Sequence, residues 1–199
     1  GVQTCALPIS QVYQNIIGAL SCIANPQSPP EMRALAEQKV TEFQEADYSI
    51  DYAMTILVNP DPNHTDYVKH FCMNCMKVNI VSKWMKYDET RKSAIQRFAM
   101  EYIANNINDN LSIPSYVMVK FAEVFVEIMK RQWPQRWSNL YDELTAVMRK
   151  SSSQFYTGVM IFEFLLQEIT DDSSSSRLAE SRRHDLQSAF NSKGDMFIR

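Results

Sequence analysis

Glycine and histidine are scarce in this chain of 199 residues, which contains four glycines and three histidines. β-Sandwiches, barrels and doubly wound sheets need glycine-rich turns, and alternating runs of β-branched residues are also few. The glycines stand singly, so the chain has no glycine-rich phosphate loop. His64, His70 and His184 lie on separate segments, with no second ligand at metal-binding spacing. We therefore expect an all-α chain that is not an enzyme and holds no metal or cofactor.

Cysteine is also sparse, with four residues in the chain. Cys72 and Cys75 form a single CxxC pair, whereas a zinc site needs a second ligand pair and a redox motif needs a βαβ context. On a helix the two side chains share a face with Phe71, so we predict reduced cysteines in the core. The pattern is typical of a reducing compartment, the cytosol or the nucleus.

Long hydrophobic runs are missing as well. The best candidate, Val159 to Leu166, is short and carries Glu163, so no membrane-spanning segment is predicted. A net charge of −3 and a pI near 5.7 argue against a surface that binds nucleic acid over its whole area. A local basic lining remains compatible with this total, so the charge neither supports nor excludes an RNA cargo.

Apolar residues recur at helical spacing along most of the chain. The segments that this pattern predicts as helices are 10–25, 31–46, 47–58, 65–87, 88–105, 114–132, 137–148, 155–169 and the stretch from 177 onward. Ser28 and Glu31 have the spacing of a capping box, and Asp88 is predicted to cap the helix that follows it. Taken in pairs, the helices form hairpins about every 40 to 47 residues, the period of HEAT and armadillo arrays. Periodicity alone leaves a stacked solenoid and a compact bundle both open.

A proline corner separates two of these helices. Trp133-Pro134 must end the upstream helix, because proline lacks the N–H that would continue it and fits at the first position of the next helix. Two apolar stripes are then expected to face each other across the corner; they comprise Val117, Phe121, Val124, Phe125 and Ile128 upstream, and Trp137, Leu140, Tyr141, Leu144, Val147 and Met148 downstream. Trp84, Trp133 and Trp137 could form a base-stacking platform for RNA, but their places on apolar stripes favour burial in the core.

The run from Glu127 to Trp137, followed by Leu140 and Leu144, resembles the motif that opens the exportin-1-like region of the importin-β superfamily. Within these nuclear transport receptors, the strings Val68-Lys-His-Phe71 to Lys83-Trp84 and Met100-Glu-Tyr-Ile-Ala-Asn105 are most similar to the exportin-5 group. The resemblance covers residues 20–199. It implies an α-solenoid of HEAT-type helical hairpins, with about four to five repeats and a truncated end.

The resemblance also implies a function. Such receptors bind Ran-GTP and cargo cooperatively in the nucleus, pass the FG-repeat proteins of the nuclear pore, and shuttle between nucleus and cytoplasm. For the exportin-5 group the implied cargo is double-stranded RNA with a short overhang, chiefly precursor microRNA. Two alternatives stay open: an exportin-1-type receptor for protein cargo with leucine-rich export signals, and a HEAT-repeat scaffold independent of Ran. A third is a small self-contained helical bundle.

Two polar stripes are the candidate Ran-binding residues. Lys120, Glu123, Glu127 and Lys130 recur along one face of their helix, opposite its apolar side, and a solvated charged face is the simpler interpretation. In the resembled family the second helix of each repeat lines the inner surface that holds Ran-GTP, here the helices 31–46, 65–87 and 114–132. Lys69, Asn74 and Lys77 form a comparable stripe on the middle one. Trp133, Pro134 and Trp137 are the structural motif.

Three segments are expected along the chain. Residues 1–9 resemble a translated sequencing adapter rather than a native leader, residues 10–107 are expected to form importin-β-type HEAT repeats, and residues 108–199 the exportin-1-like region. The last residues, Met196 to Arg199, fall inside a continuing helical pattern. The natural protein is therefore expected to be longer.

Overall fold

The computed structural model describes residues 9–59, 61–170 and 178–194. In these residues the regular structure is helical throughout, and the prediction of an all-α chain is confirmed. The chain divides into two compact units, which meet between Ser82 and Lys83. The predicted leader up to residue 8 and the last residues 196–199 lie outside the described part.

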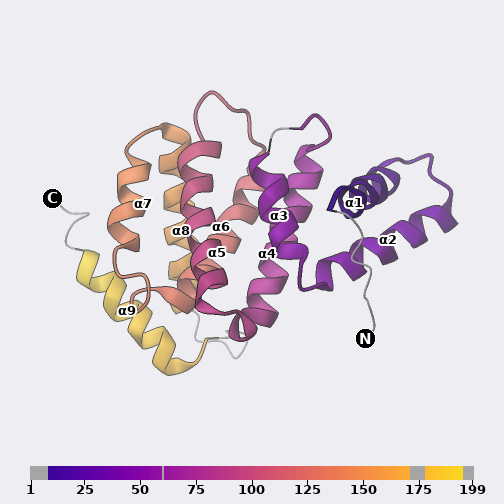
Figure 1. The fold of residues 1–199 in the computed structure, drawn as a ribbon. Coiled ribbons are helices and arrows are strands. Elements are labelled where there is room, and N and C mark those ends of the chain that lie inside the picture. Colours follow the sequence, from indigo (N-terminus) through magenta and orange to yellow (C-terminus); the bar gives the residue numbers. More distant parts are fainter. Residues whose placement is uncertain (1–8, 60, 171–177, 195–199) are drawn as a thin grey trace. The chain divides into compact units, whose positions relative to one another are not determined.

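Unit 1 contains two helical hairpins (Figure 1). The first is α1 (Ile9–Ala24) with α2 (Pro30–Glu45), and the second is α3 (Ser49–Val58) with α4 (Asp66–Lys83). Leu20, Phe43 and Ile50 are all less than 5% exposed. The predicted apolar stripe of α2 is buried only in part, because Met32 and Leu35 are 54% and 47% exposed. The turn between the hairpins is pinned by Asn79, whose amide donates to the carbonyl oxygen of Gln44 at 2.9 Å.

The predicted capping box before α2 is wrong. Pro29 occupies the N-cap position and no side chain caps the helix. Ser28 instead donates its hydroxyl to the carbonyl oxygen of Cys22 at 2.7 Å, which satisfies an acceptor in the last turn of α1. Ser28 therefore closes the preceding helix rather than opening the next one. The cap at Asp88 is confirmed, since its carboxylate accepts from the N–H of Arg91 at 2.7 Å.

The long helix predicted at 65–87 is shorter than expected. It ends at Lys83, and Trp84–Lys86 form a 3₁₀ turn, η1. A 3₁₀ turn aligns residues three apart, and both Trp84 and Tyr87 are buried, with their rings 6.3 Å apart. The two aromatic rings therefore pack against each other where the α-helix ends.

Unit 2 contains η1 and five α-helices (Figure 1). These are α5 (Glu89–Asn106), α6 (Ser115–Gln132), α7 (Leu140–Met148), α8 (Ser152–Thr170) and α9 (Glu180–Gly194). The helix α7 packs on α5, and α8 packs on α6, while α7 and α8 pack on each other as a hairpin. In a HEAT array, the first helices of successive hairpins pack on each other, and so do the second helices. The predicted HEAT-type hairpins are confirmed.

The close approach of α7 and α8 depends on Gly158, where an added Cβ would lie 2.3 Å from Cγ of Met148. Because α8 packs against both α6 and α7, the two apolar stripes at the proline corner do not simply face each other. Each of them also packs against α8. All the predicted residues of these two stripes are buried. The prediction was wrong only about which helix they pack against, since it did not include α8.

The corner itself is a loop of seven residues between α6 and α7. Trp133 is the C-cap of α6, and its N–H donates to the carbonyl oxygen of Met129 at 3.0 Å. The Trp133–Pro134 peptide bond is cis. Turns then continue to Leu140, so Pro134 ends α6 as predicted but does not open α7. Trp84, Trp133 and Trp137 are each at most 5% exposed, and their assignment to the core is confirmed.

Candidate interaction surface

The charged stripe on α6 separates into two halves. In the first half, Nζ of Lys120 lies 2.6 Å from Oε2 of Glu123, and both side chains remain partly exposed. A pair of this kind, three residues apart on a helix, stabilises its helix only modestly. These two residues therefore remain available to a partner protein.

In the second half, Glu127 and Lys130 are buried. Nζ of Lys130 lies 2.8 Å from Oε1 of Glu127 and 3.0 Å from Oε2 of Glu168 on α8. Oε2 of Glu127 accepts from Arg131 at 2.5 Å. The expectation that these positions lie opposite the packed side of α6 is wrong, because α8 covers this part of the helix. We refer to Glu127, Lys130, Arg131 and Glu168 as the ion network.

The ion network shifts the pKa of Glu127. Burial acts to raise the pKa of its carboxyl group, but hydrogen bonds and charge from Lys130 and Arg131 outweigh it and hold the pKa below its ordinary value. Glu127 is therefore ionised at neutral pH. Lys130 and Arg131 also lie in the last turn of α6, where their positive charge interacts favourably with the negative end of the helix dipole.

The stripe on α4 differs from that on α6. Lys69, Asn74 and Lys77 are all half-buried. Lys69 pairs with Asp66 at 3.3 Å, and Asn74 donates to the side chain of Gln44 on α2 at 3.4 Å. None of these three side chains is as deeply buried as that of Lys130. All three remain accessible within unit 1.

Arg182 holds the end of α6, a role that sequence analysis did not predict. Its guanidinium donates to the carbonyl oxygens of Lys130 (2.7 Å), Met129 (3.4 Å) and Trp133, and to the side chain of Gln135. The carbonyl oxygen of Met129 also accepts from the N–H of Trp133. The end of a helix leaves other carbonyl groups without a partner in the helix, and a cation is favoured there. Burial lowers the pKa of Arg182, opposed by the nearby charge of Asp185. The contact joins residues about 50 positions apart, so no local pattern could predict it.

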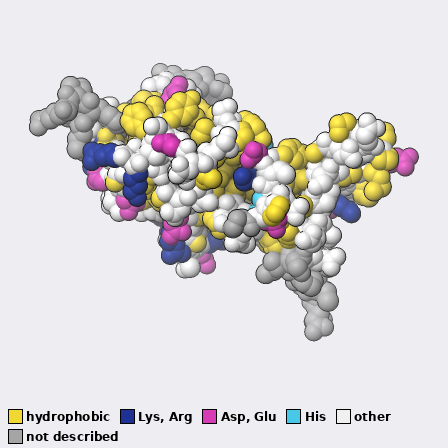
Figure 2. Space-filling view, turned by 90° about the horizontal axis from the view of Figure 1, so that it is seen from above, with side chains coloured by type: hydrophobic (Ala, Val, Ile, Leu, Met, Phe, Trp, Pro, Cys, Tyr) yellow, Lys and Arg dark blue, Asp and Glu magenta, His cyan; other side chains and the backbone are white. Residues whose placement is uncertain are grey.

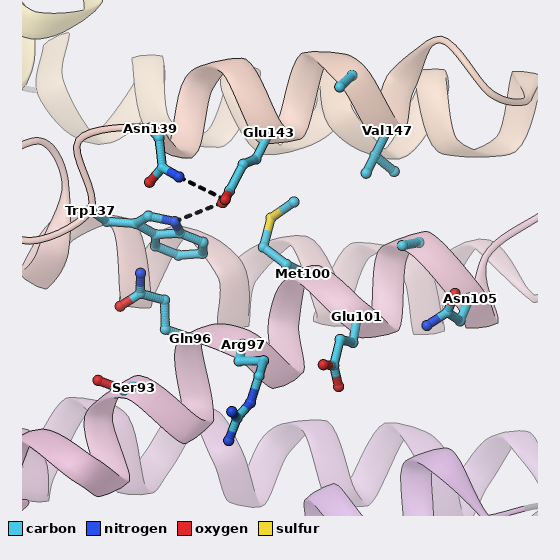
Figure 3. Close-up of a pocket in the computed structure, with 12 residues that line it drawn as sticks. Ser93, Gln96, Arg97, Met100, Glu101, Asn105, Trp137, Asn139, Glu143 and Val147 are labelled. Carbon is cyan, nitrogen blue, oxygen red and sulfur yellow. Dashed lines mark hydrogen bonds between the residues drawn. The ribbon is translucent and has the colours of Figure 1, made fainter.

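An open groove of about 600 Å³ runs between α5 and α7 (Figure 3). The polar side chains of Gln96, Arg97 and Glu101 come from α5. On the other wall Glu143 accepts hydrogen bonds from Trp137 Nε1 at 3.1 Å and Asn139 at 2.7 Å. The groove lies on the first helices of the hairpins. Its lining includes Trp137 and Val147 from the predicted apolar stripe, and none of the candidate Ran-binding residues. Sequence reasoning did not single it out.

Charge is mixed on one face of the described residues. On the face shown in Figure 2, Lys and Arg side chains are interspersed with Asp and Glu, without a large area of one sign. The described residues hold no group of three or more His, Cys, Asp or Glu side chains that could bind a metal. None of the helices between residues 9 and 194 is both long and apolar enough to cross a membrane.

The CxxC pair is part of the core of unit 1. Cys72 and Cys75 are free thiols and less than 2% exposed. Burial raises the pKa of Cys72 to about 12, and it raises the pKa of Cys75 further. Since the thiolate is the reactive form, these cysteines are structural, as predicted. Cys5 lies outside the described residues.

Comparison with known proteins gives a consistent result. Residues 114–197 match the family described as exportin 1-like protein. The chain is 26% identical over 187 residues to exportin-5 of Dictyostelium discoideum, covering 93% of this chain and 16% of that protein. It is 22% identical over 180 residues to human exportin-5, covering 90% and 14%. Exportin-1 of Schizosaccharomyces pombe is 22% identical over 141 residues, covering 70% and 13%.

The chain thus spans about a sixth of the length of the curated relatives it matches. The matched region begins at Pro114, the N-cap of α6, and contains the Trp-Pro corner, the ion network and α9. The resemblance found at the corner is confirmed by this match and by the exportin relatives. The chain is thus similar to exportins, which are receptors of the importin-β superfamily.

Proposed function

We propose that the chain is part of a nuclear export receptor whose second helices bind Ran in its GTP-bound form. The observation that carries the proposal is the family match over 114–197, together with similarity to exportins over most of the chain. The stacking of α6 on α8 gives unit 2 a row of second helices on which a partner could lie. Such a receptor is a carrier without catalysis of its own.

The α4 stripe and the first half of the α6 stripe are the proposed Ran contacts. Lys69, Asn74 and Lys77 are accessible on α4, and Lys120 and Glu123 on α6. Glu127 and Lys130 belong to the same predicted set, but their proposed role is to fix α6 through the ion network. A buried pair that holds two helices together contributes to a binding surface by setting its shape.

The cargo is proposed from the relatives. Similarity to two exportin-5 proteins favours structured double-stranded RNA, such as precursor microRNA, over protein cargo with leucine-rich signals. Such RNA is recognised by shape and phosphates. On the face shown in Figure 2 the charges are mixed, and we place most cargo contacts elsewhere in the full receptor. Binding to FG-repeat proteins and shuttling between nucleus and cytoplasm complete the proposal.

The domain division is part of the same proposal. We place the importin-β-type repeats at 10–107 and the exportin-1-like region at 108–199. The compact units meet at 82/83 and the family match begins at 114. The polar loop after α5 lies between these two positions and is the proposed junction.

The test is binding of the chain to Ran loaded with GTP and, separately, with GDP. We expect a clear preference for the GTP form. Lys77→Glu and Lys120→Glu should each weaken it about tenfold, since reversal puts like charges across an interface. Lys150→Glu is the matched control, because Lys150 is exposed in the turn between α7 and α8 and belongs to neither polar stripe. Equal or absent binding by the folded chain would favour a scaffold independent of Ran.

A further inference from the structure

The turn between α1 and α2 carries a sequence motif that the proposed function does not use. Of the eight prolines in the chain, Pro29 is the one that directly follows a serine or threonine, Ser28. Pro26 precedes the same serine by two positions. A serine flanked by prolines in this way is the acceptor pattern of proline-directed protein kinases, which read a residue that has no N–H and a fixed φ directly after the acceptor. Ser28 is therefore the position in this chain that fits that class of enzyme.

The turn is accessible to such an enzyme. Pro26, Gln27, Pro29 and Pro30 are exposed, and Ser28 is half-buried. Pro29 has a φ of −56° and a ψ of 142°, so the chain leaves Ser28 in the extended polyproline conformation. An extended segment is the form in which a peptide lies in the cleft of a kinase. The hydroxyl group of Ser28 only has to give up its present hydrogen bond before it can react.

That hydrogen bond stabilises the end of α1. The hydroxyl group of Ser28 donates to the carbonyl oxygen of Cys22 at 2.7 Å. The N–H of Asn25, just after the helix, donates to the carbonyl oxygen of Ser21 at 3.1 Å. A serine phosphate carries a charge of roughly −1.5 to −2 at neutral pH, and its oxygens act as acceptors. Phosphorylation would therefore break the bond to Cys22, because a phosphate oxygen and a carbonyl oxygen repel each other.

A guanidinium group lies beside the same turn. Nη2 of Arg33, in α2, donates to the carbonyl oxygen of Asn25 at 3.1 Å, and the N–H of Ser28 donates to that same oxygen at 3.1 Å. Nε of Arg33 is enclosed and has no hydrogen-bond partner among the described residues. Arginine binds phosphate by parallel hydrogen bonds from two N–H groups. Arg33 is thus placed to hold a phosphate on Ser28, although Glu31, exposed in the first turn of α2, carries a charge that opposes it.

We propose that Ser28 is phosphorylated by a proline-directed kinase, and that the phosphate exchanges the bond to Cys22 on α1 for an ion pair with Arg33 on α2. In the transfer, Oγ of Ser28 forms a bond to the γ-phosphorus of Mg-ATP. The bond from that phosphorus to the β,γ-bridging oxygen breaks, and ADP leaves with its electron pair. The hydroxyl proton passes to the catalytic base of the kinase. The modified serine then stabilises the helix that follows it instead of the one that precedes it.

Incubation of the full chain with a proline-directed kinase and Mg-ATP tests the site, with peptide mass spectrometry as the readout and a short Ser-Pro peptide to show that the kinase is active. We expect phosphate on Ser28, and its loss in Ser28→Ala. Ser112→Ala is the matched control, because Ser112 is exposed and lies two positions before a proline rather than directly before it. This control should take up as much phosphate as the unmodified chain. Absence of phosphate on Ser28, or equal uptake by Ser28→Ala, would overturn the proposal.

Hydrogen exchange of the phosphorylated and unmodified chains tests the change of partner. Amides in the last turn of α1 should exchange about fivefold faster after phosphorylation, since one hydrogen bond is lost. Amides at the start of α2 should exchange about threefold slower, because a charged pair is gained. Arg33→Met should still accept the phosphate but lose the slowing in α2, whereas Arg149→Met, at an exposed arginine of unit 2, should keep it. Unchanged exchange in α1, or the same slowing in Arg33→Met, would contradict the exchange of partners.

Discussion

The stripes on α4 and α6 are alike in sequence, each placing charged and polar residues along one side of an amphipathic helix. In the structure they differ. Lys69 of the α4 stripe pairs with a neighbour on its own helix, whereas Lys130 of the α6 stripe also reaches Glu168 on the next second helix. The difference teaches that a polar stripe in a repeat array can be an internal junction as well as an outer surface.

Substitution of Trp137, an apolar residue that packs against α6, should give the largest loss of stability. Trp137 is 3% exposed and lies 5.8 Å from the ring of Phe125. Trp137→Ala should cost about 3–5 kcal/mol of unfolding free energy, because it leaves a large cavity beside α6. Urea unfolding measures this, with Phe155→Ala as the control, since Phe155 is 57% exposed on α8. An unchanged unfolding midpoint for Trp137→Ala would contradict its place in the core.

Substitutions in the ion network separate the two halves of the α6 stripe. Lys130→Met should cost about 2 kcal/mol, since it leaves Glu127 and Glu168 without their shared cation. Lys120→Met, the same change on the same helix, should cost less than about 1 kcal/mol because its pair is partly exposed. If the two variants are equally stable in urea, the buried and exposed halves do not differ as described.

The ion network also predicts a pH dependence. The pKa of Glu127 is lowered in the folded state, so its stabilisation is fully present above the unfolded pKa of about 4.3 and is lost as pH falls through the lower folded value. The stability difference between the unmodified chain and Glu127→Gln should therefore be constant from neutral pH to about 5.5 and shrink below about 4. A difference that grew on acidification would have the wrong sign.

Substitution of Gly158 tests how closely α7 and α8, the helices of the hairpin that carries Glu168, must pack on each other. Gly158→Ala should cost about 1–2 kcal/mol, because the clash with Met148 outweighs the gain in helix propensity. Adding Met148→Ala should relieve the clash, so the double variant should lose less than the two single effects combined. Additive losses would mean that α7 and α8 are not in this contact.

Substitution of Asp109 should give the smallest loss of stability. Its carboxylate accepts from the N–H groups of Ser153 at 2.7 Å and Ser152 at 3.1 Å, at the start of α8. The N–H and hydroxyl of Ser153, and then the N–H of Ser152, lower the pKa of Asp109. Asp109→Asn should lower the Tm by about 2 °C at pH 7. The difference should shrink as pH falls and the native carboxyl becomes protonated, since the pKa of Asp109 is lowered in the folded state. Asp51→Asn, an exposed aspartate in the first turn of α3, serves for comparison.

Helices and core were predictable because they depend on local periodicity. The stripe of α6 and the cap at Asp88 follow from spacing within one turn, and both are present. The prediction for Ser28 was wrong because a serine between two helices can either cap the next helix or bond back to the preceding one, and Ser28 does the second. The resemblance to exportins came from the string at the corner and did not depend on the fold.

The site was less predictable, since burial of a charged residue depends on which helix covers it. Glu127 meets Lys130 within one turn, and that pair could be expected from spacing. Contact with Glu168, 38 positions beyond Lys130, and the hold of Arg182 on the end of α6 require the stacking of separate hairpins. The groove between α5 and α7 likewise depends on how two first helices pack.

The most direct test of the proposed role is hydrogen exchange of the chain with and without Ran, in its GTP and GDP forms. We predict that Ran-GTP protects amides in α4 and in the first half of α6. The loop from Trp133 to Asn139 and the groove side of α5 should be unchanged. Protection that is absent, or equal with Ran-GDP, would contradict the account and leave an exportin-like helical array without a role in Ran binding.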